Sequence, residues 1–168
     1  MSRVFAYVLS SLIVLAAFAA PASAADFQLE KYFAGRTVAD GQFSAINGVS
    51  RKFKVFLTGT WNGKRLKLVE DFVYADGERD RKTWRFTKTG SNSYSGTRED
   101  VRGVALVTVT GNTARFSYDV YLDGAARKNL VRFHDTMVLD PARGTVLNTA
   151  WVTKFGLPVA KTRVAFRR

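Results

Sequence analysis

Apolar and polar side chains alternate along most of this chain, in segments separated by short turns that contain glycine. A two-residue period is typical of antiparallel β-strands, whose successive side chains point to opposite faces. The clearest turn is Asn62-Gly63, because both central residues of a type I′ hairpin turn need positive φ. The pattern predicts ten strands, over residues 41–47, 50–61, 64–74, 79–88, 93–101, 104–110, 113–122, 126–139, 145–153 and 158–167.

The spacing of these segments predicts an all-β fold, an antiparallel up-and-down meander of about eight to ten strands that closes into a barrel. Long helical patterns, which parallel βαβ units need, are missing from the sequence. A flattened sandwich is the alternative. A barrel of this size has room for a ligand, whereas a sandwich has a filled core.

One short helix is expected before the sheet, over residues 26–35. Asp26 is a candidate N-cap and Gly35 a candidate C-terminal stop. Such a helix would close one end of a barrel. An extended plug that uses the same apolar side chains is the alternative.

The first 24 residues predict a cleavable export signal. Arg3 precedes an apolar run over residues 4–20, and Ala22-Ser23-Ala24 has the small-x-small pattern that signal peptidase recognises. We therefore expect residues 1–24 to be removed, residues 25–168 to form a single domain, and the protein to be periplasmic. An uncleaved anchor is the alternative, because the apolar run approaches the length that spans a bilayer.

The amino-acid composition limits the kinds of site and binding partner that this protein can have. The chain has no cysteine, which excludes disulfides, thiol catalysis and acylation of a signal-peptide cysteine, so it is not a lipoprotein. Its net charge is +12, and Lys and Arg are spread along the chain. Because we expect export, an anionic membrane surface or lipopolysaccharide is favoured over nucleic acid as the binding partner of these basic residues. The alternative is that the basic residues bind no partner and only keep the protein soluble.

Alternation places an unusually aromatic set of side chains on the inner face, together with a few charged ones. A closed barrel with this interior would bind an apolar ligand and hold its polar group. The predicted ligand-binding residues are Glu70, Phe72, Tyr74, Trp84, Arg98, Asp100, Phe116, Tyr118 and Asp135.

Glu70 and Asp71 are neighbours on one strand, so their side chains point to opposite faces and only one is interior. An interior Glu70 needs a cation or several hydrogen-bond donors, and Arg98 or Arg81 could supply the charge. A structural ion pair, a ligand anchor and a proton-transfer group are the three interpretations. If Asp100 or Asp135 lay within hydrogen-bond reach of Glu70, one carboxyl of the pair would have a raised pKa.

Other common sites lack support in the sequence. His134 is the single histidine, and its alternation places it in solvent, opposite the face of Asp135. We find no nucleophile elbow, phosphate-binding glycine loop or dinucleotide fingerprint. We therefore predict no metal and no cofactor.

Several motifs follow the order found in one family. The longest runs from Leu66 to Glu78, as Leu-x-Leu-x-Glu-Asp-Phe-x-Tyr-x-Asp-Gly-Glu, and the others are Leu29-Glu30-Lys31-Tyr32-Phe33-x-Gly35, Arg81, Trp84, Tyr94-x-Gly96, Asp100-Val101-x-Gly103-x-Ala105, Tyr118, Asp135-x-Met137, Asn148 and Lys154-Phe155-Gly156. Over nearly the whole chain after residue 24, the sequence resembles the DUF3833 family of bacterial exported proteins. The resemblance implies a lipocalin-like barrel, an envelope location and an association with membrane lipid metabolism. The sequence differs from the lipoprotein members of this family at Ala25, where those members have a cysteine.

The function predicted from the sequence is binding of a hydrophobic or amphipathic ligand, an acyl lipid, inside the barrel. One alternative is a cofactor-free enzyme of isomerase or cyclase type that uses Glu70, Asp100 or Asp135 for proton transfer. Another is a non-catalytic interaction module with a solid core. These three remain open on the sequence alone.

Overall fold

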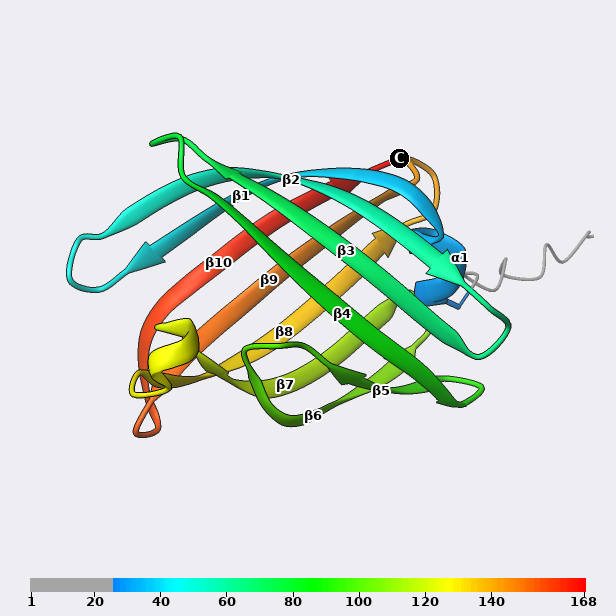
Figure 1. The fold of residues 1–168 in the computed structure, drawn as a ribbon. Helices are drawn as coiled ribbons and strands as arrows, with labels where there is room; N and C mark the ends of the chain where they lie inside the picture. Colours follow the sequence, from blue (N-terminus) through cyan, green and yellow to red (C-terminus); the bar gives the residue numbers. More distant parts are fainter. Residues whose placement is uncertain (1–25) are drawn as a thin grey trace, which may run out of the picture.

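The structure, a computed structural model, describes residues 26–168, so the predicted export signal lies outside the described residues. One short helix precedes ten antiparallel strands (Figure 1). The elements are α1 (Leu29–Phe33), β1 (Gly35–Ala45), β2 (Ser50–Trp61), β3 (Arg65–Tyr74), β4 (Arg79–Gly90), β5 (Ser93–Thr97), β6 (Val101–Thr110), β7 (Thr113–Tyr121), the 3₁₀ turn η1 (Gly124–Ala126), β8 (Leu130–Asp140), β9 (Thr145–Lys154) and β10 (Leu157–Arg167).

The sheet closes on itself. Each strand pairs with its neighbour in sequence, and β1 also pairs with β10, with Ala39 opposite both Val55 of β2 and Phe166 of β10. Closure removes the unpaired edges that an open sheet would expose. The prediction of an antiparallel up-and-down barrel is therefore confirmed, and the sandwich alternative is wrong.

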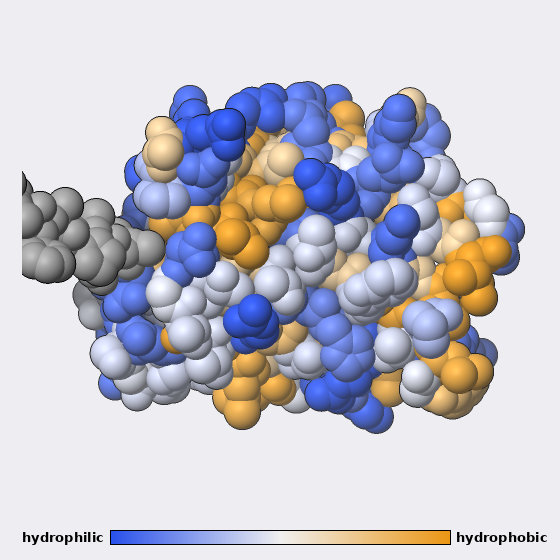
Figure 2. Space-filling model, turned by 180° about the vertical axis from the view of Figure 1, so that it is seen from behind, coloured by the Kyte–Doolittle hydropathy of each residue, from blue (hydrophilic) through white to orange (hydrophobic). Residues whose placement is uncertain are grey.

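Alternation along each strand separates the interior of the barrel from its outer wall. On β6, Ala105, Val107 and Val109 are buried, while Leu106 and Thr108 between them are exposed. This alternation of buried and exposed residues follows from the two-residue period of an extended chain. Figure 2 shows the resulting outer surface, on which hydrophilic residues cover much of the wall.

Helix α1 closes one end of the barrel, where the C-terminus also lies (Figure 1). Its side chains Leu29, Tyr32 and Phe33 are buried, and the Tyr32 hydroxyl donates to the carbonyl oxygen of Phe166 at 3.1 Å. The helix packs directly on the backbone of β2. A Cβ atom at Gly59 would lie 1.8 Å from the carbonyl oxygen of Phe33, so that position needs glycine.

The short helix predicted before the sheet is confirmed, but two details of that prediction, its bounds and its N-cap, are wrong. The helix covers residues 29–33, not 26–35, and its N-cap is Gln28, which makes no side-chain capping bond, so Asp26 is not the cap. The chain before the helix is instead fixed by Phe27, whose side chain is buried and whose N–H donates to the carbonyl oxygen of Gly111 at 2.8 Å.

Strand β1 begins at Gly35, six residues before the predicted start at residue 41. Its first interior side chains are Thr37 and Ala39, which are small and only weakly apolar, so the alternation there is faint in the sequence. Strand β8 also begins later than predicted, at Leu130, because η1 and Arg127, with a left-handed φ of 49°, occupy the preceding residues.

Five turns form the end of the barrel opposite α1: β1–β2, β3–β4, β5–β6, β7–β8 and β9–β10. We call this end the rim; it consists of residues 46–49, 75–78, 98–100, 122–129 and 155–156. In the described part of the chain, no helix combines the length and apolar character needed to cross a membrane.

Candidate functional site

A cavity of about 400 Å³ occupies the barrel interior, between α1 and the rim. All nine residues predicted to bind a ligand line this cavity: Glu70, Phe72, Tyr74, Trp84, Arg98, Asp100, Phe116, Tyr118 and Asp135. The fold therefore brings together residues from five segments that are spread over more than 60 positions of the sequence: β3, β4, the β5–β6 turn, β7 and β8. These nine residues are therefore placed where they could contact a ligand, and ligand contact itself stays a prediction.

Two groups of aromatic side chains form opposite parts of the wall. In the first, Phe116 and Tyr118 stack on β7 with ring centroids 5.6 Å apart, and Tyr118 stacks on Phe133, its cross-strand partner on β8. In the second, Phe72 and Tyr74 stack on β3 at 6.1 Å. Residues two apart on one strand share a face, which is why these pairs meet and why the alternation predicted them.

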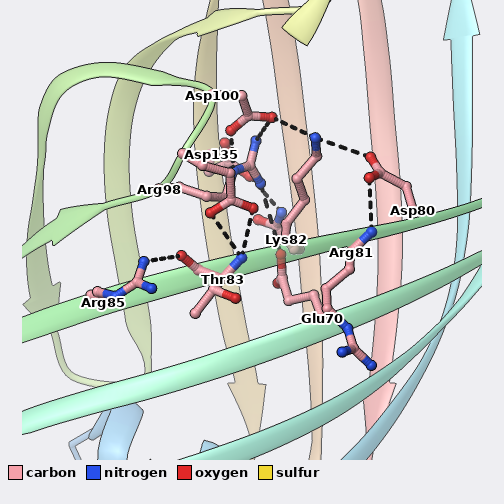
Figure 3. A network of polar contacts seen from close by, with 11 residues as sticks. Glu70, Asp80, Arg81, Lys82, Thr83, Arg85, Arg98, Asp100 and Asp135 are labelled. Carbon is pink, nitrogen blue, oxygen red and sulfur yellow. Dashed lines mark hydrogen bonds and ion pairs between the residues drawn. The ribbon is translucent and has the colours of Figure 1, made fainter. Parts of the chain in front are cut away.

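Charged side chains that include Glu70, Lys82, Arg98 and Asp100 form a network of polar contacts (Figure 3). Arg98 binds Asp100 through two nitrogens, from Nε to Oδ1 at 2.6 Å and from Nη2 to Oδ2 at 3.3 Å. Lys82 extends the network, with its Nζ 3.4 Å from Asp100 and 3.0 Å from Asp80. The two-point contact fixes the plane of the Arg98 guanidinium in the cavity wall.

The Arg98 guanidinium also lies over two aromatic rings, 4.9 Å from the centroid of Trp84 and 5.8 Å from that of Tyr118. Burial by itself lowers the pKa of Arg98, but the facing Tyr118, Asp100 and Glu70 outweigh it and raise the pKa. Arg98 is therefore a permanent positive charge inside the barrel, held by both carboxylate and ring contacts.

Glu70 points into the cavity, as predicted, while Asp71 points outward and pairs with Arg81. The predicted ion pair with Arg98 is present, with Arg98 Nη1 3.8 Å from Glu70 Oε2, although this distance is longer than that of a hydrogen bond. Oε2 is buried and has no hydrogen-bond partner among the described residues. Burial raises the pKa of Glu70 to about 7, with Arg98 opposing the shift and Asp100 adding to it.

Asp135 lies across the cavity on β8 and accepts a hydrogen bond from Asn148 Nδ2 on β9 at 2.5 Å. Burial raises the pKa of Asp135 to about 6, against the effects of the Asn148 bond, the facing Tyr118 hydroxyl and the Arg98 charge. Its second oxygen, Oδ2, and the amide oxygen of Asn148 are both buried with no partner in the described protein.

Three hydrogen-bond acceptors in one cavity therefore lack donors: Glu70 Oε2, Asp135 Oδ2 and Asn148 Oδ1. Each unsatisfied buried polar group costs about 1–3 kcal/mol. A ligand that brings donors would recover this free energy. The two carboxyls with raised pKa values can also exchange protons near neutral pH.

Sequence reasoning missed Lys82 and Asn148 as site residues. Lys82 had a usable signal, because it lies two positions before Trp84 on the same face and is the cross-strand partner of Glu70. Asn148 had none beyond its place in the family motif. Its contact with Asp135 depends on the register of β9 against β8, which pairs Met137 with Asn148.

Metal-ligating chemistry has little to build on here. Within residues 26–168, no group of three or more His, Cys, Asp or Glu side chains could hold a metal ion. His134 is exposed on the outer wall, where its ring nitrogens contact Ser117 and Thr153.

The fold is similar to that of the S-type phycobiliprotein lyase CPES from Guillardia theta. The two share 9% sequence identity and a TM-score of 0.60, over 84% of this chain and 93% of that chain. A redesigned β-barrel, mFAP1, solved with DFHBI, is more distant: 7% identity and a TM-score of 0.41, over 82% of this chain and 96% of that one. At such identity the first similarity shows a shared fold alone. A comparison with curated proteins gives no match.

The family is shown by the sequence. The model of the DUF3833 family, described as a protein of unknown function, matches residues 8–168, which include every side chain of the cavity. The motif residues Glu70, Trp84, Asp100, Tyr118, Asp135 and Asn148 all line that cavity. The chain therefore belongs to the DUF3833 family.

Proposed function

We propose that this protein binds a single-chain amphipathic ligand, an acyl lipid, inside the barrel. The observation that carries the proposal is the combination of an aromatic cavity with three buried acceptors that lack donors. Ligand sites are typically apolar, with a few polar groups that fix orientation. A filled structural core has neither a cavity of this size nor several unsatisfied acceptors.

The cavity supports one chain rather than two. Its volume of about 400 Å³ is near the lower end of the roughly 300–1,000 Å³ found for ligand pockets. At about 30 Å³ per water, that space corresponds to on the order of a dozen small groups. Leu29, Phe33 and Phe166 form an apolar floor beside α1, where a tail would lie.

The head group that fits best carries hydrogen-bond donors. All three buried atoms without partners are acceptors, and the donors Lys82 and Arg98 already bind Asp80 and Asp100. A hydroxyl or amine would satisfy the acceptors, whereas a carboxylate would face Glu70 and Asp135 with like charge. Alcohols and amines are therefore the expected head-group classes.

An enzymatic role is the second candidate, favoured by the raised pKa values of Glu70 and Asp135. A group with a pKa of about 7 is suited to proton transfer at neutral pH, as an isomerase or cyclase acting on a lipid would need. The phycobiliprotein lyase shares the fold, so chemistry inside such a barrel is compatible with the architecture.

The proposal includes a periplasmic location, supported by the predicted signal in residues 1–24. Recovery of the protein from the periplasmic fraction with Ala25 at its N-terminus would agree with it. Recovery of the intact chain in the membrane fraction would contradict it.

A competition experiment tests the ligand assignment. An environment-sensitive single-chain probe with a hydroxyl head group, 11-(dansylamino)undecan-1-ol, is displaced by dodecylamine, dodecanol or dodecanoate. We expect both donor-bearing compounds to displace the probe at lower concentration than dodecanoate. Glu70→Gln should reduce this preference, while Asp71→Asn, its neighbour on the outer face, should leave it unchanged. Equal displacement by all three compounds would contradict the head-group assignment, and no probe binding would contradict the site.

Product analysis separates binding from catalysis. Lipid extract incubated with the protein should be recovered chemically unchanged if the protein is a binder. Formation of a new product that Glu70→Gln abolishes would favour the enzymatic candidate.

A further inference from the structure

The rim of the barrel has two unlike halves. Three of its turns carry large exposed apolar side chains, and the other two carry acidic ones. The exposed apolar side chains are Ile46 and Val49 in the β1–β2 turn, Leu122 before η1, and Phe155 and Leu157 at the β9–β10 turn. We call residues 46–49, 122–129 and 154–157 the apolar arc.

The three turns of the apolar arc are consecutive around the barrel, because the strand order runs β2, β1, β10, β9, β8, β7. Two contacts tie them together. The N–H of Ile46 donates to the carbonyl oxygen of Val159 at 2.9 Å, and Lys154 Nζ donates to Asn129 Oδ1 at 2.8 Å. In Figure 2, hydrophobic residues gather at the right-hand end of the molecule, which is the rim end in that view. The arc is therefore one continuous side of the rim, where the half-exposed Leu122 also lines the cavity and so places its mouth.

Phe155 is held in a conformation that disfavours its own side chain. It forms a two-residue hairpin turn with Gly156, and its φ of 51° is in the left-handed region, where asparagine or glycine is usual. The side chain is 95% exposed, so packing against the protein does not compensate for the strain. An exposed aromatic ring in a strained position indicates a role outside the folded chain.

Basic side chains accompany these apolar ones. Arg127 and Lys128 are exposed in the β7–β8 turn, and Lys154 Nζ lies 5.9 Å from the centroid of the Phe155 ring. Asp123, the one acidic residue of the arc, accepts from the backbone N–H groups of Lys128 and Asn129. The arc thus presents apolar tips beside positive charge.

The opposite half of the rim differs in sign. Its β3–β4 turn contains Asp76 and Glu78, both bound by Arg51, and its β5–β6 turn contains the exposed Glu99, whereas Asp100 in that turn is buried and bound by Arg98. A negatively charged surface would therefore be attracted to the apolar arc more strongly than to the opposite half of the rim.

We propose that the apolar arc docks this protein on an anionic phospholipid bilayer, with Phe155, Leu157 and Ile46 in the boundary between head groups and acyl chains. Arg127, Lys128 and Lys154 then meet the lipid phosphates. The apolar side chains of the arc alternate with basic residues, and a bilayer surface likewise places acyl chains beneath phosphate groups. Each Lys or Arg near an anionic membrane raises the affinity about fivefold. Docking orients the cavity mouth toward the bilayer, from which a lipid could enter.

Flotation with vesicles tests the proposal. The protein is expressed from its full chain, purified as the cell processes it, and mixed with vesicles of phosphatidylcholine alone or with one third phosphatidylglycerol. We expect binding at least tenfold tighter to the anionic vesicles. Binding equal to both vesicles, or to neither, would overturn the proposal.

Phe155→Asn is the decisive variant, since asparagine suits the turn and the change should not unfold the protein. We expect an equal or higher melting temperature and about tenfold or greater loss of vesicle binding. Leu157→Ser should also weaken binding, whereas Leu106→Ser on the outer wall should not; these leucines are 69% and 70% exposed. Vesicle binding unchanged by Phe155→Asn, or equally reduced by Leu106→Ser, would overturn the proposal.

Docking does not require an occupied cavity, so the two proposals can fail separately. Phe155→Asn should leave displacement of the dansyl probe in vesicle-free solution unchanged, and Glu70→Gln should leave flotation unchanged. If instead the wild-type protein is a dimer that Phe155→Asn converts to a monomer, the arc is a protein interface and the bilayer proposal is wrong.

Discussion

Two buried glutamates in the same barrel have opposite environments. Glu30, at the closed end, accepts from Lys88 Nζ and the Tyr94 hydroxyl, both at 2.5 Å. Burial alone would raise its pKa, but these bonds outweigh burial and lower it. Glu70, halfway along the barrel, has a buried oxygen without a donor and a pKa raised to about 7. The difference separates a carboxylate that stabilises the fold from one that is available to a ligand.

The closed end as a whole has the character of a structural core. Tyr32 packs edge to face with both Phe27 and Phe33, Phe33 packs edge to face with Phe166, and the Tyr32 hydroxyl donates a hydrogen bond to the carbonyl oxygen of Phe166. The central cavity has equally large aromatic side chains, yet they surround space rather than fill it. Aromatic content alone therefore does not distinguish a core from a binding site; the unsatisfied acceptors do.

The largest expected effect is on the stability of the closed end. Glu30→Gln leaves Lys88 without its charge partner, and breaking a buried pair typically costs about 3–5 kcal/mol. Because Lys88 is partly exposed, we expect about 3 kcal/mol or somewhat less in urea unfolding at pH 7. A stability equal to that of the wild type would contradict the structural role of Glu30.

Glu70→Gln should show the opposite pattern. It removes a carboxylate that is costly to ionise in its buried site, so we expect unchanged or higher stability at pH 8. Affinity for dodecylamine should fall by about tenfold, as expected when one charged hydrogen-bond partner is lost. A large loss of stability with unchanged affinity would make Glu70 structural, like Glu30.

The pH dependence of stability should differ in sign between the two glutamates. The folded pKa of Glu70, about 7, is above the ordinary value of 4.5, so its contribution is full below pH 4.5 and is lost as pH rises through 7. One such proton changes stability by at most about 1.4 kcal/mol per pH unit. Glu30, with a lowered pKa, contributes above pH 4.5 and loses its effect as pH falls.

Urea titrations between pH 4 and 8 measure these slopes. Glu70→Gln should make the wild-type curve less steep between pH 5 and 7, and Asp71→Asn on the outer face should not. A slope that Glu70→Gln leaves untouched would show that the carboxyl titrates at its ordinary pKa.

The smallest expected effect concerns Tyr32. Tyr32→Phe keeps the ring packing and removes the bonds from the hydroxyl to the carbonyl oxygens of Phe166 and Gly144. We expect a loss of about 1 kcal/mol in urea unfolding, with no change in probe displacement. A change in displacement would show that the closed end is coupled to the cavity.

The fold was predictable because the alternation is strong where interior side chains are large. Strand β7, with Phe116, Tyr118 and Val120 facing inward, was found nearly at its bounds. The start of β1 was missed because its interior residues Thr37 and Ala39 give little contrast with their neighbours.

The site was predictable as a set of inward-facing residues, but its bonding was not. The alternation of side chains along β3 places Glu70 inside the barrel. The hydrogen bonds from Arg98 to Asp100 and from Asn148 to Asp135, however, depend on turn geometry and strand register. The phase of the pattern shows which face a side chain occupies. Distances across a barrel come from three-dimensional closure, which the linear pattern leaves open.

Native mass spectrometry of the protein purified from its native cells tests the central claim most directly. We predict one bound single-chain lipid per protein, with a hydroxyl or amine head group, whose occupancy falls in Glu70→Gln and is unchanged in Asp71→Asn. A mass equal to that of the bare polypeptide under gentle ionisation, in the wild-type protein and both variants, would contradict the claim and favour a barrel that acts through its surface.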